Sequence, residues 1–253
     1  MIFDTHAHYD DEQFDGDRDE LLKSMPDFGV GTIVDVSATY ESCEKVLTLA
    51  GKYPHVYAAI GVHPDEVGEL NEDKIQHMKE LCCNKKVVAV GEIGLDYYWD
   101  NEPHEVQQKW FIRQLELAGE VKKPVIIHSR EAAADTMYIM KNYAQGLGGV
   151  IHCYSYSREM AEEYVKMGFY IGIGGVVTFK NAKKLKDVAA AIPIEKIVLE
   201  TDCPYMAPEP YRGKRNQSSY IRYVAEKIAE LKEMSPEEVI AVTEKNARDL
   251  YGI

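Results

Sequence analysis

Residues 106–128 read VQQKWFIRQLELAGEVKKPVIIH, a stretch in which a helical pattern leads directly into a short apolar run. The helical part repeats its apolar residues at spacings of four, seven and four, and so predicts one helix face with Val106, Trp110, Leu117 and Val121. The run Val125–Ile127 has the length of a buried strand and is followed by His128. Patterns of this kind alternate along the whole chain, which predicts repeated βα units and a parallel sheet.

The number of these units decides the architecture. Eight runs of strand length are each followed by a stretch that can be helical, and eight units form a (β/α)8 TIM barrel. We therefore predict an α/β fold with a single barrel domain over residues 1–253. Ser235-Pro236-Glu237-Glu238 combines an N-cap, a first-position proline and a capping-box glutamate, which predicts one extra C-terminal helix. The predicted strands are Met1–Thr5, Gly31–Val36, Val56–Ile60, Val87–Val90, Val125–Ile127, Gly149–Ile151, Phe169–Ile171 and Lys196–Leu199.

Composition excludes several classes of protein. No apolar run approaches the roughly 18 residues of a membrane span, and the start Met1-Ile2-Phe3-Asp4 lacks a basic segment, so we expect an unexported, cytoplasmic protein with no membrane partner. Five cysteines without a C-x-x-C pair indicate neither a disulfide framework nor a thiolate zinc site. The net charge of −13 opposes nonspecific attraction to polyanions, although cations held by acidic residues can reverse the field locally.

Histidines and carboxylates stand at the ends of the predicted strands. His6-Ala7-His8 closes the first strand, and its two imidazoles can point the same way because strand side chains alternate. In a barrel the carboxyl ends of all strands converge on the face that carries active sites. Imidazole and carboxylate ligands without thiolate suit zinc, manganese or magnesium, and this set could hold a pair of divalent ions. The remaining candidate ligands are Glu92, His128, His152 and Asp202.

Six short motifs follow one another along nearly the whole chain: Asp4-Thr5-His6-Ala7-His8, Gly61-Val62-His63-Pro64, Gly91-Glu92-Ile93-Gly94-Leu95-Asp96-Tyr97, His128-Ser129-Arg130, His152-Cys153-Tyr154-Ser155 and Glu200-Thr201-Asp202-Cys203-Pro204. Their order resembles that of the TatD family of deoxyribonucleases. The resemblance implies an amidohydrolase-type barrel with two metal positions, which hydrolyses phosphodiester bonds of DNA, often from the 3′ end. It also implies that His6, His8, Glu92, His128, His152 and Asp202 are the ligands, with Glu92 bridging.

Catalytic roles fall on Asp202 and Glu92. A carboxylate at the edge of a metal site can both bind the ion and accept the proton of the attacking water, and we expect Asp202 to do both. Asp4 shares the strand face of His6 and His8, so it either orients an imidazole or serves as a buried capping carboxylate.

Several further residues are candidates for substrate contacts. His63 can be a ligand, a phosphate donor or a structural histidine, and we favour phosphate contact. The guanidiniums of the loop after the Asp202 strand can bind phosphate bidentately, whereas the alternative is a solvated loop. Aromatic side chains after the fourth strand can stack on a terminal base or pack in the core. The candidate substrate residues are His63, Arg130, Tyr97, Trp99, Arg212, Lys214 and Arg215.

The sequence thus predicts a two-metal hydrolase whose substrate is DNA, single-stranded or at 3′ ends. Magnesium, manganese and zinc remain open as the metal. One alternative is a barrel hydrolase with the same ligands that acts on a carboxylic ester, lactone or aminoacyl ester, because the motif fixes the metals and not the leaving group. Another is a metal-stabilised binding protein without turnover.

Overall fold

The computed structural model describes residues 1–99 and 101–253 of the chain. Its strands are hydrogen-bonded in the consecutive order β1 to β8, with helices between them. A consecutive parallel order of eight strands with intervening helices is that of a (β/α)8 barrel, so the predicted fold class is confirmed. The described chain divides into two compact units: unit 1, Met1–Asp35 with His152–Ile253, and unit 2, Val36–Ile151.

Unit 1 carries the first two and the last two strands. β1 pairs in parallel with β2, and β7 pairs in parallel with β8. A parallel bridge between Ala7 and Cys203 joins β1 to the segment after β8. The strands are β1 Ile2–Ala7, β2 Val30–Val36, β7 Tyr170–Ile173 and β8 Ile197–Leu199, and the helices are α1 Arg18–Ser24, α6 Arg158–Lys166, α7 Lys183–Ala191, α8 Ile221–Lys232 and α9 Pro236–Tyr251.

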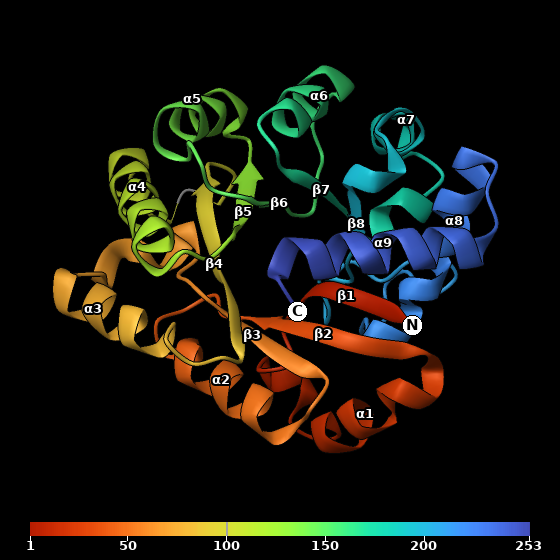
Figure 1. Ribbon diagram of the computed structural model, residues 1–253, viewed down its shortest axis with the longest axis horizontal. Helices are drawn as coiled ribbons and strands as arrows, with labels where there is room; N and C mark the ends of the chain where they lie inside the picture. Colours follow the sequence, from red (N-terminus) through yellow and green to blue (C-terminus); the bar gives the residue numbers. More distant parts are fainter. Residues whose placement is uncertain (100) are drawn as a thin grey trace. The chain divides into compact units, whose positions relative to one another are not determined.

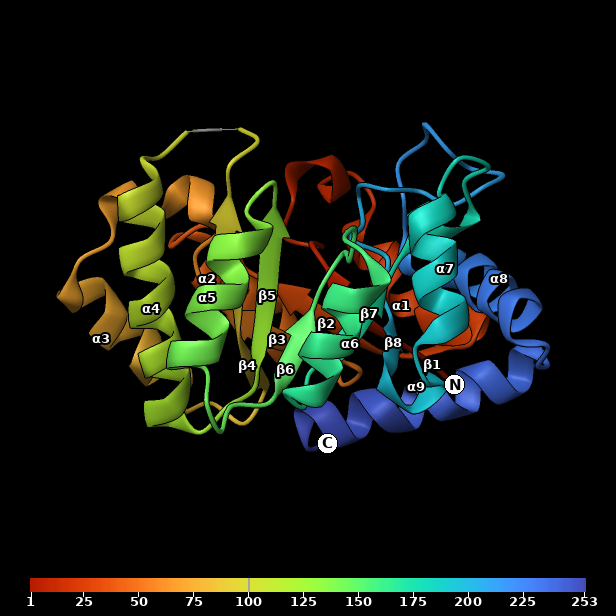
Figure 2. The ribbon, with the colours of Figure 1, turned by 90° about the horizontal axis from the view of Figure 1, so that it is seen from above.

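The predicted C-terminal helix is present as α9. It begins with the predicted capping box, in which Ser235 and Glu238 bond each other's backbone. Within unit 1, α9 lies across the ends at which β1 and β8 begin (Figure 2). Asn246 of α9 donates to the carbonyls of Ile194 and Ile197, both 2.7 Å away, and so satisfies backbone groups at the start of β8.

Unit 2 carries the four middle strands, which pair in parallel from β3 to β6. The helices alternate with these strands and pack along them (Figure 1). All ten residues of β4 are buried, as expected for a parallel strand that is covered on both faces. The strands are β3 Val56–Ile60, β4 Val87–Asp96, β5 Val125–Arg130 and β6 Gly149–Ile151, and the helices are α2 Ser42–Lys52, α3 Glu72–Leu81, α4 His104–Val121 and α5 Ala133–Tyr143.

β4 and β5 extend furthest beyond their predicted ends. β4 runs to Asp96 and β5 to Arg130, because the two strands continue to pair along Gly94–His128 and Asp96–Arg130. Glu92 and His128 therefore lie inside strands and do not follow them. Gly94, at a φ of +149°, permits the pairing, since a Cβ there would lie 1.9 Å from the carbonyl oxygen of His128.

Short 3₁₀ segments complete the backbone around these elements. In unit 1 they are η1 Glu12–Phe14, η2 Met25–Phe28, η4 Gly175–Thr178, η5 Ile194–Lys196 and η6 Ser218–Tyr220. In unit 2 the segment η3 Pro64–Glu69 follows His63, whose side chain caps it. No helix in the described part of the chain is long and apolar enough to cross a membrane.

Candidate metal centre

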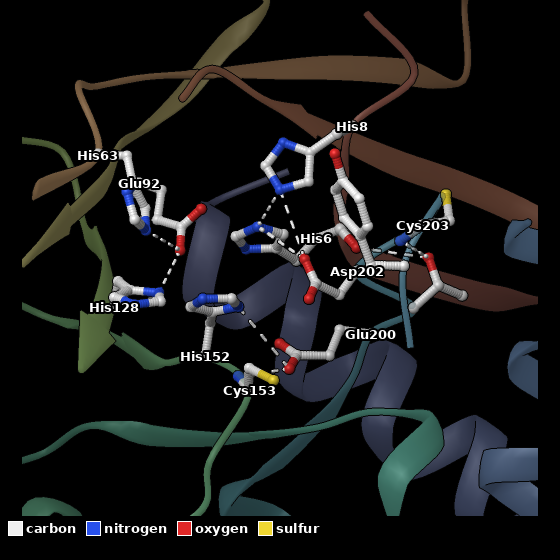
Figure 3. A network of polar contacts seen from close by, with 12 residues as sticks. His6, His8, His63, Glu92, His128, His152, Cys153, Glu200, Asp202 and Cys203 are labelled. Carbon is white, nitrogen blue, oxygen red and sulfur yellow. Dashed lines mark hydrogen bonds and ion pairs between the residues drawn. The ribbon is translucent and has the colours of Figure 1, made fainter. Parts of the chain in front are cut away.

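Each unit brings together a cluster of imidazole and carboxylate side chains (Figure 3). The cluster of unit 1 comes from the end of β1, from His152 and from the residues that follow β8. The cluster of unit 2 comes from β4, from β5 and from the residues that follow β3. Every residue that the sequence analysis named as a metal ligand belongs to one of the two. The unit 1 cluster is His6, His8, His152 and Asp202, and the unit 2 cluster is His63, Glu92 and His128.

In the unit 1 cluster the nitrogens of the strand-one histidines face each other. His6 Nε2 and His8 Nε2 are 3.0 Å apart, and Asp202 Oδ1 lies 3.8 Å and 3.4 Å from them. The ring of His152 stacks on that of His6 with centroids 4.0 Å apart. The histidines are buried, and the Asp202 side chain is 16% exposed. The alternation along β1 therefore does bring both imidazoles to one point.

This arrangement fits a divalent cation. A tetrahedral ion with ligands at roughly 2.0–2.1 Å separates neighbouring ligand atoms by about 3.3 Å, which falls within the range of the distances above. Burial raises the pKa of Asp202, but the hydrogen bond with His8 and the charges of His152 and His6 outweigh it, so the pKa lies below its usual range. Asp202 is therefore ionised at neutral pH, as a ligand and a proton acceptor must be.

Asp4 holds the backbone that carries Asp202. Its Oδ1 accepts from the Thr201 amide at 2.9 Å, and its Oδ2 accepts from the hydroxyls of Thr201 and Ser218, both at 2.6 Å. Burial raises the pKa of Asp4 to about 6, even though these hydrogen bonds lower it. Of the two roles considered from the sequence, the contacts are those of a buried capping carboxylate, because they reach backbone and hydroxyl groups and no imidazole side chain.

Glu200 is a buried acid of this cluster that the sequence analysis did not single out. Its Oε1 accepts from the backbone amide of Cys153 and lies 4.0 Å from Nδ1 of His152. Burial raises the pKa of Glu200 to about 8, and the nearby His152 offsets this only in part. A cavity of about 380 Å³ opens beside it, lined also by Asp202 and by Leu185 at the start of α7.

In the unit 2 cluster His128 sits between two carboxylates. Its Nδ1 lies 2.7 Å from Oε1 of Glu92, and its Nε2 lies 3.0 Å from Oδ2 of Asp96. His63 Nε2 lies 3.9 Å from the same oxygen of Glu92. A carboxylate that accepts the Nε2 proton directs Nδ1 of the same ring toward a cation, as outer carboxylates do at metal-bound histidines. Asp96 is therefore a positioning residue, although in the sequence it stands out only as a member of the motif Gly91-Glu92-Ile93-Gly94-Leu95-Asp96-Tyr97.

The electrostatics of His128 follow from these neighbours. Burial lowers the pKa of His128, but the hydrogen bonds with Asp96 and Glu92 outweigh it and raise the pKa to about 9. The same contact with His128 holds the pKa of Asp96 below its usual range, against the effect of burial. Two carboxylates around one imidazole are a negatively charged donor set, which a divalent cation would neutralise.

Two glutamines of α4 fix the strand ends that carry the unit 2 cluster. Gln114 accepts from the Val62 amide at 2.9 Å and donates to the Val62 carbonyl at 3.1 Å. Gln107 makes the same pair of bonds with Asp96, both at 2.9 Å. Both glutamines are fully buried. They explain why polar residues occupy the inner face of this helix beside the predicted apolar ones.

The predicted aromatic contacts of unit 2 differ in their exposure. Tyr97 is covered, because its ring stacks on His104 at 3.5 Å and its hydroxyl donates to Asp135. The Trp99 side chain is 58% exposed. Its neighbour Tyr98, which was not among the candidates from the sequence, is 54% exposed. The guanidinium of Arg130 lies 3.8 Å from the centre of the Tyr98 ring. We call Tyr98, Trp99 and Arg130 the aromatic platform.

The basic loop of unit 1 also divides into engaged and exposed residues. Arg215 forms an ion pair with Asp17 and donates to the carbonyl of Gln13, so its guanidinium is already used within the fold. Arg212 and Lys214 are exposed, with Arg212 over the ring of Phe179. These two side chains remain the cations that the loop offers to an external phosphate.

Comparison with known proteins decides the family. The model of the family described as TatD related DNase matches residues 3–252. The chain belongs to the TatD family. It is 46% identical over 254 residues, with both chains fully covered, to the Bacillus subtilis (strain 168) protein named "Uncharacterized metal-dependent hydrolase YabD". It is 37% identical over 257 residues to the metal-dependent hydrolase YcfH of Escherichia coli (strain K12), and covers 96% of that protein.

A solved structure supports the same assignment. The TatD homologue YjjV of Escherichia coli K12 superposes with a TM-score of 0.93 and 33% identity, over 100% of this chain and 98% of that one. This likeness confirms the (β/α)8 barrel independently of the strand order. The protein is a metal-dependent hydrolase of the TatD family.

Proposed function

We propose that this protein is a metal-dependent deoxyribonuclease that hydrolyses phosphodiester bonds near the 3′ end of single-stranded DNA. The observation that carries the proposal is the pair of histidine and carboxylate clusters, one in each unit, whose donors suit magnesium, manganese or zinc. Family membership supports the same reaction class, since the matching family is described as TatD related DNase.

The residues divide the work as follows. His6, His8, His152 and Asp202 would hold one divalent cation, and Glu92 and His128 a second. Such cations, when bound, lower the pKa of an attacking water and offset the charge that develops on the scissile phosphate. Asp202 has the low pKa that keeps a carboxylate available to accept the proton of that water.

The aromatic platform supports nucleic acid over a small ester as substrate. Exposed Tyr98 and Trp99 offer ring faces on which bases stack without regard to sequence, and Arg130 adds a cation beside them. Arg130 lies two residues after His128 in β5, and Tyr98 lies two residues after Asp96 of β4. The residues of the aromatic platform therefore follow directly, along β4 and β5, on those of the unit 2 cluster.

The decisive experiment is an assay of labelled single-stranded DNA with magnesium, manganese or zinc, in parallel with a panel of carboxylic esters, lactones and aminoacyl esters. We expect turnover of DNA that chelation abolishes, and products that shorten from an unblocked 3′ end only. Turnover of an ester without turnover of DNA under any cation would favour the ester hydrolase alternative.

The platform gives a second test of the substrate. Trp99→Ala should raise KM for single-stranded DNA and leave hydrolysis of a small phosphodiester nearly unchanged, because only the polymer has further bases to stack. Tyr138→Ala is the matched control, since Tyr138 on α5 is 66% exposed and lies outside the platform. Equal effects of the two changes would count against a role of the platform in DNA binding.

A further inference from the structure

Unit 2 contains a second acidic feature that the hydrolase site does not use. A pocket of about 200 Å³ is lined by the start of α3, the segment η3 and the residues after β2. Nζ of Lys74, at the wall of the pocket, lies 3.4 Å from Oε2 of Glu69 and over the ring of Tyr40. It therefore offsets the charge of only one of the carboxylates that line the pocket. The acidic side chains that line the pocket are Glu41, Asp65, Glu66, Glu69 and Glu102.

Asp65 is the member of this pocket that also reaches inward. Its side chain is only 10% exposed, and its Oδ1 is buried without a hydrogen-bond partner among the described residues. Its Oδ2 lies 3.8 Å from Nδ1 of His63, and its backbone amide donates to that nitrogen at 3.2 Å. A buried carboxylate oxygen without a donor is costly, so this one is suited to an external positive ligand.

Asp65 shares its position with two other ligand-type side chains. One ligand atom each of His63, Asp65 and Asp96 lies within 4.8 Å of the others. Two ligands of one cation are separated by at most twice the metal–ligand distance, which is roughly 4–5 Å for the oxygen ligands of magnesium or calcium. The carboxylates of Asp65 and Asp96 can therefore contact one ion directly, and His63 can join them when its hydrogen bond with the Asp65 amide opens.

Asp96 retains the capacity to take part. Its Oδ1 accepts from the amides of Tyr98 and Trp99, and its Oδ2 accepts from His128. A carboxylate offers about four lone-pair positions, so one position on Oδ2 remains for a cation.

We propose that His63, Asp65 and Asp96 form a third site for a hard divalent cation, reached through the acidic pocket. Two carboxylates and one imidazole, with water in the remaining positions, suit manganese, magnesium or calcium and bind them weakly. The site differs from the two clusters of the hydrolase because Asp65 belongs to neither. A cation there would add positive charge near His63, in a chain whose net charge of −13 otherwise repels a polyanion.

The test is a count of bound Mn²⁺ that does not depend on hydrolysis. Metal-free protein is dialysed against Mn²⁺ from micromolar to millimolar concentrations at pH 7.5, and bound metal is measured by elemental analysis. We expect the parent to bind one weak equivalent in addition to its tight ones. Asp65→Asn, which keeps size and removes charge, should lose the weak equivalent and keep the tight ones.

Two further variants make the result interpretable. Asp73→Asn changes an exposed carboxylate in the first turn of α3 that does not line the pocket, so it should bind as the parent does. The double change Glu66→Gln with Glu69→Gln alters only exposed pocket residues, and should weaken the weak equivalent several-fold while the fold is unaffected. This second variant tests the site even if Asp65→Asn fails to fold.

Three outcomes would overturn the proposal. The parent could lack a weak equivalent, Asp65→Asn could bind as many ions as the parent with equal affinity, or Asp65→Asn could lose a tight equivalent in place of the weak one. Because the readout is binding, a protein that fails to cleave DNA can still support or refute the third site.

Discussion

Replacing Glu200 by glutamine should change how the stability of the metal-free protein depends on pH. Glu200 is fully buried, and burial raises its pKa from the ordinary value of 4.5 to about 8. The folded protein therefore keeps this proton where the unfolded chain has already lost it. Between pH 4.5 and 8 the unfolded state therefore binds fewer protons than the folded state, so the free energy of unfolding falls as pH rises.

The size of the effect follows from the same values. One proton changes the free energy of unfolding by about 1.4 kcal/mol per pH unit, and over the whole window the loss reaches roughly 4–5 kcal/mol. Glu200→Gln keeps the shape and the oxygen that accepts from Cys153, but it has no proton to lose. The difference in stability between parent and variant should therefore grow steadily from pH 5 to 8 and level off above it.

The assay is urea unfolding of the chelator-treated proteins at pH 5, 6, 7 and 8. Other buried acids contribute to both curves equally, so the difference between parent and variant isolates Glu200. Glu195→Gln, an exposed carboxylate just before β8, should give a curve parallel to that of the parent. Parallel curves for Glu200→Gln as well would refute the reasoning, since they would mean that Glu200 ionises in the folded state as it does in the unfolded chain.

Three further changes test the site and its supports. Asp202→Asn should lower kcat of the metal-dependent hydrolysis by about 10²–10⁴-fold without loss of fold by circular dichroism; near-parental kcat with metal bound would exclude its role. Glu92→Gln should lower the number of tightly bound ions found by elemental analysis, and unchanged content would count against Glu92 as a metal ligand. Gln114→Met leaves both backbone groups of Val62 without partners, so it should cost about 2–5 kcal/mol in urea unfolding. Gln76→Met on the exposed side of α3 should stay within about 0.5 kcal/mol of the parent, and equal losses would contradict the argument.

The strands could be predicted because apolar runs of strand length are a local signal. β3 and β6 have the predicted bounds. β4 was predicted too short because Gly91, Glu92 and Gly94 interrupt its apolar run, and β5 because the polar residues from His128 to Arg130 end its run; the two strands nevertheless continue to pair. The extension depends on a backbone approach at Gly94 that only the folded chain shows.

The predicted face of α4 was right at its centre and wrong at its edges. Trp110 and Leu117 are buried, whereas Val106 and Val121 are only half-buried. The inner face includes Gln107 and Gln114, which hydropathy alone assigns to solvent. A buried amide is tolerated here because it satisfies a backbone donor and acceptor at a strand end.

The candidate ligands could be named from the sequence because they stand where the apolar runs of the predicted strands end, on the side where a barrel gathers its functional side chains. The acids that contact these ligands or the backbone around them could not be named in this way. Asp96, Asp65 and Glu200 are ordinary carboxylates in the sequence, and their roles depend on which imidazole or amide lies within reach in space. Under the proposed function, the attraction of this acidic chain for DNA would likewise be local and come from exposed cations such as Arg212 and Lys214.

The loop after β8 allows a quantitative test of whether exposed cations bind the phosphates of the proposed DNA substrate. If Arg212 and Lys214 each contact one phosphate, their joint replacement by glutamine should raise KM for single-stranded DNA. It should also reduce the steepness of log Kobs against log salt by roughly 1.4, at about 0.7 for each lost contact. Hydrolysis of a small phosphodiester, which cannot span the loop, should change much less.

Arg215→Gln is the comparison, because its guanidinium already pairs with Asp17. The side chains of Arg215 and Asp17 are 31% and 38% exposed, so their ion pair is screened by solvent. Arg215→Gln should therefore cost less than about 1 kcal/mol of stability and leave KM nearly unchanged. If Arg215→Gln instead raised KM as much as the double change, the ion pair would have to open on DNA binding. A salt dependence unaltered by the double change would mean that Arg212 and Lys214 are solvated and that the phosphates are bound elsewhere.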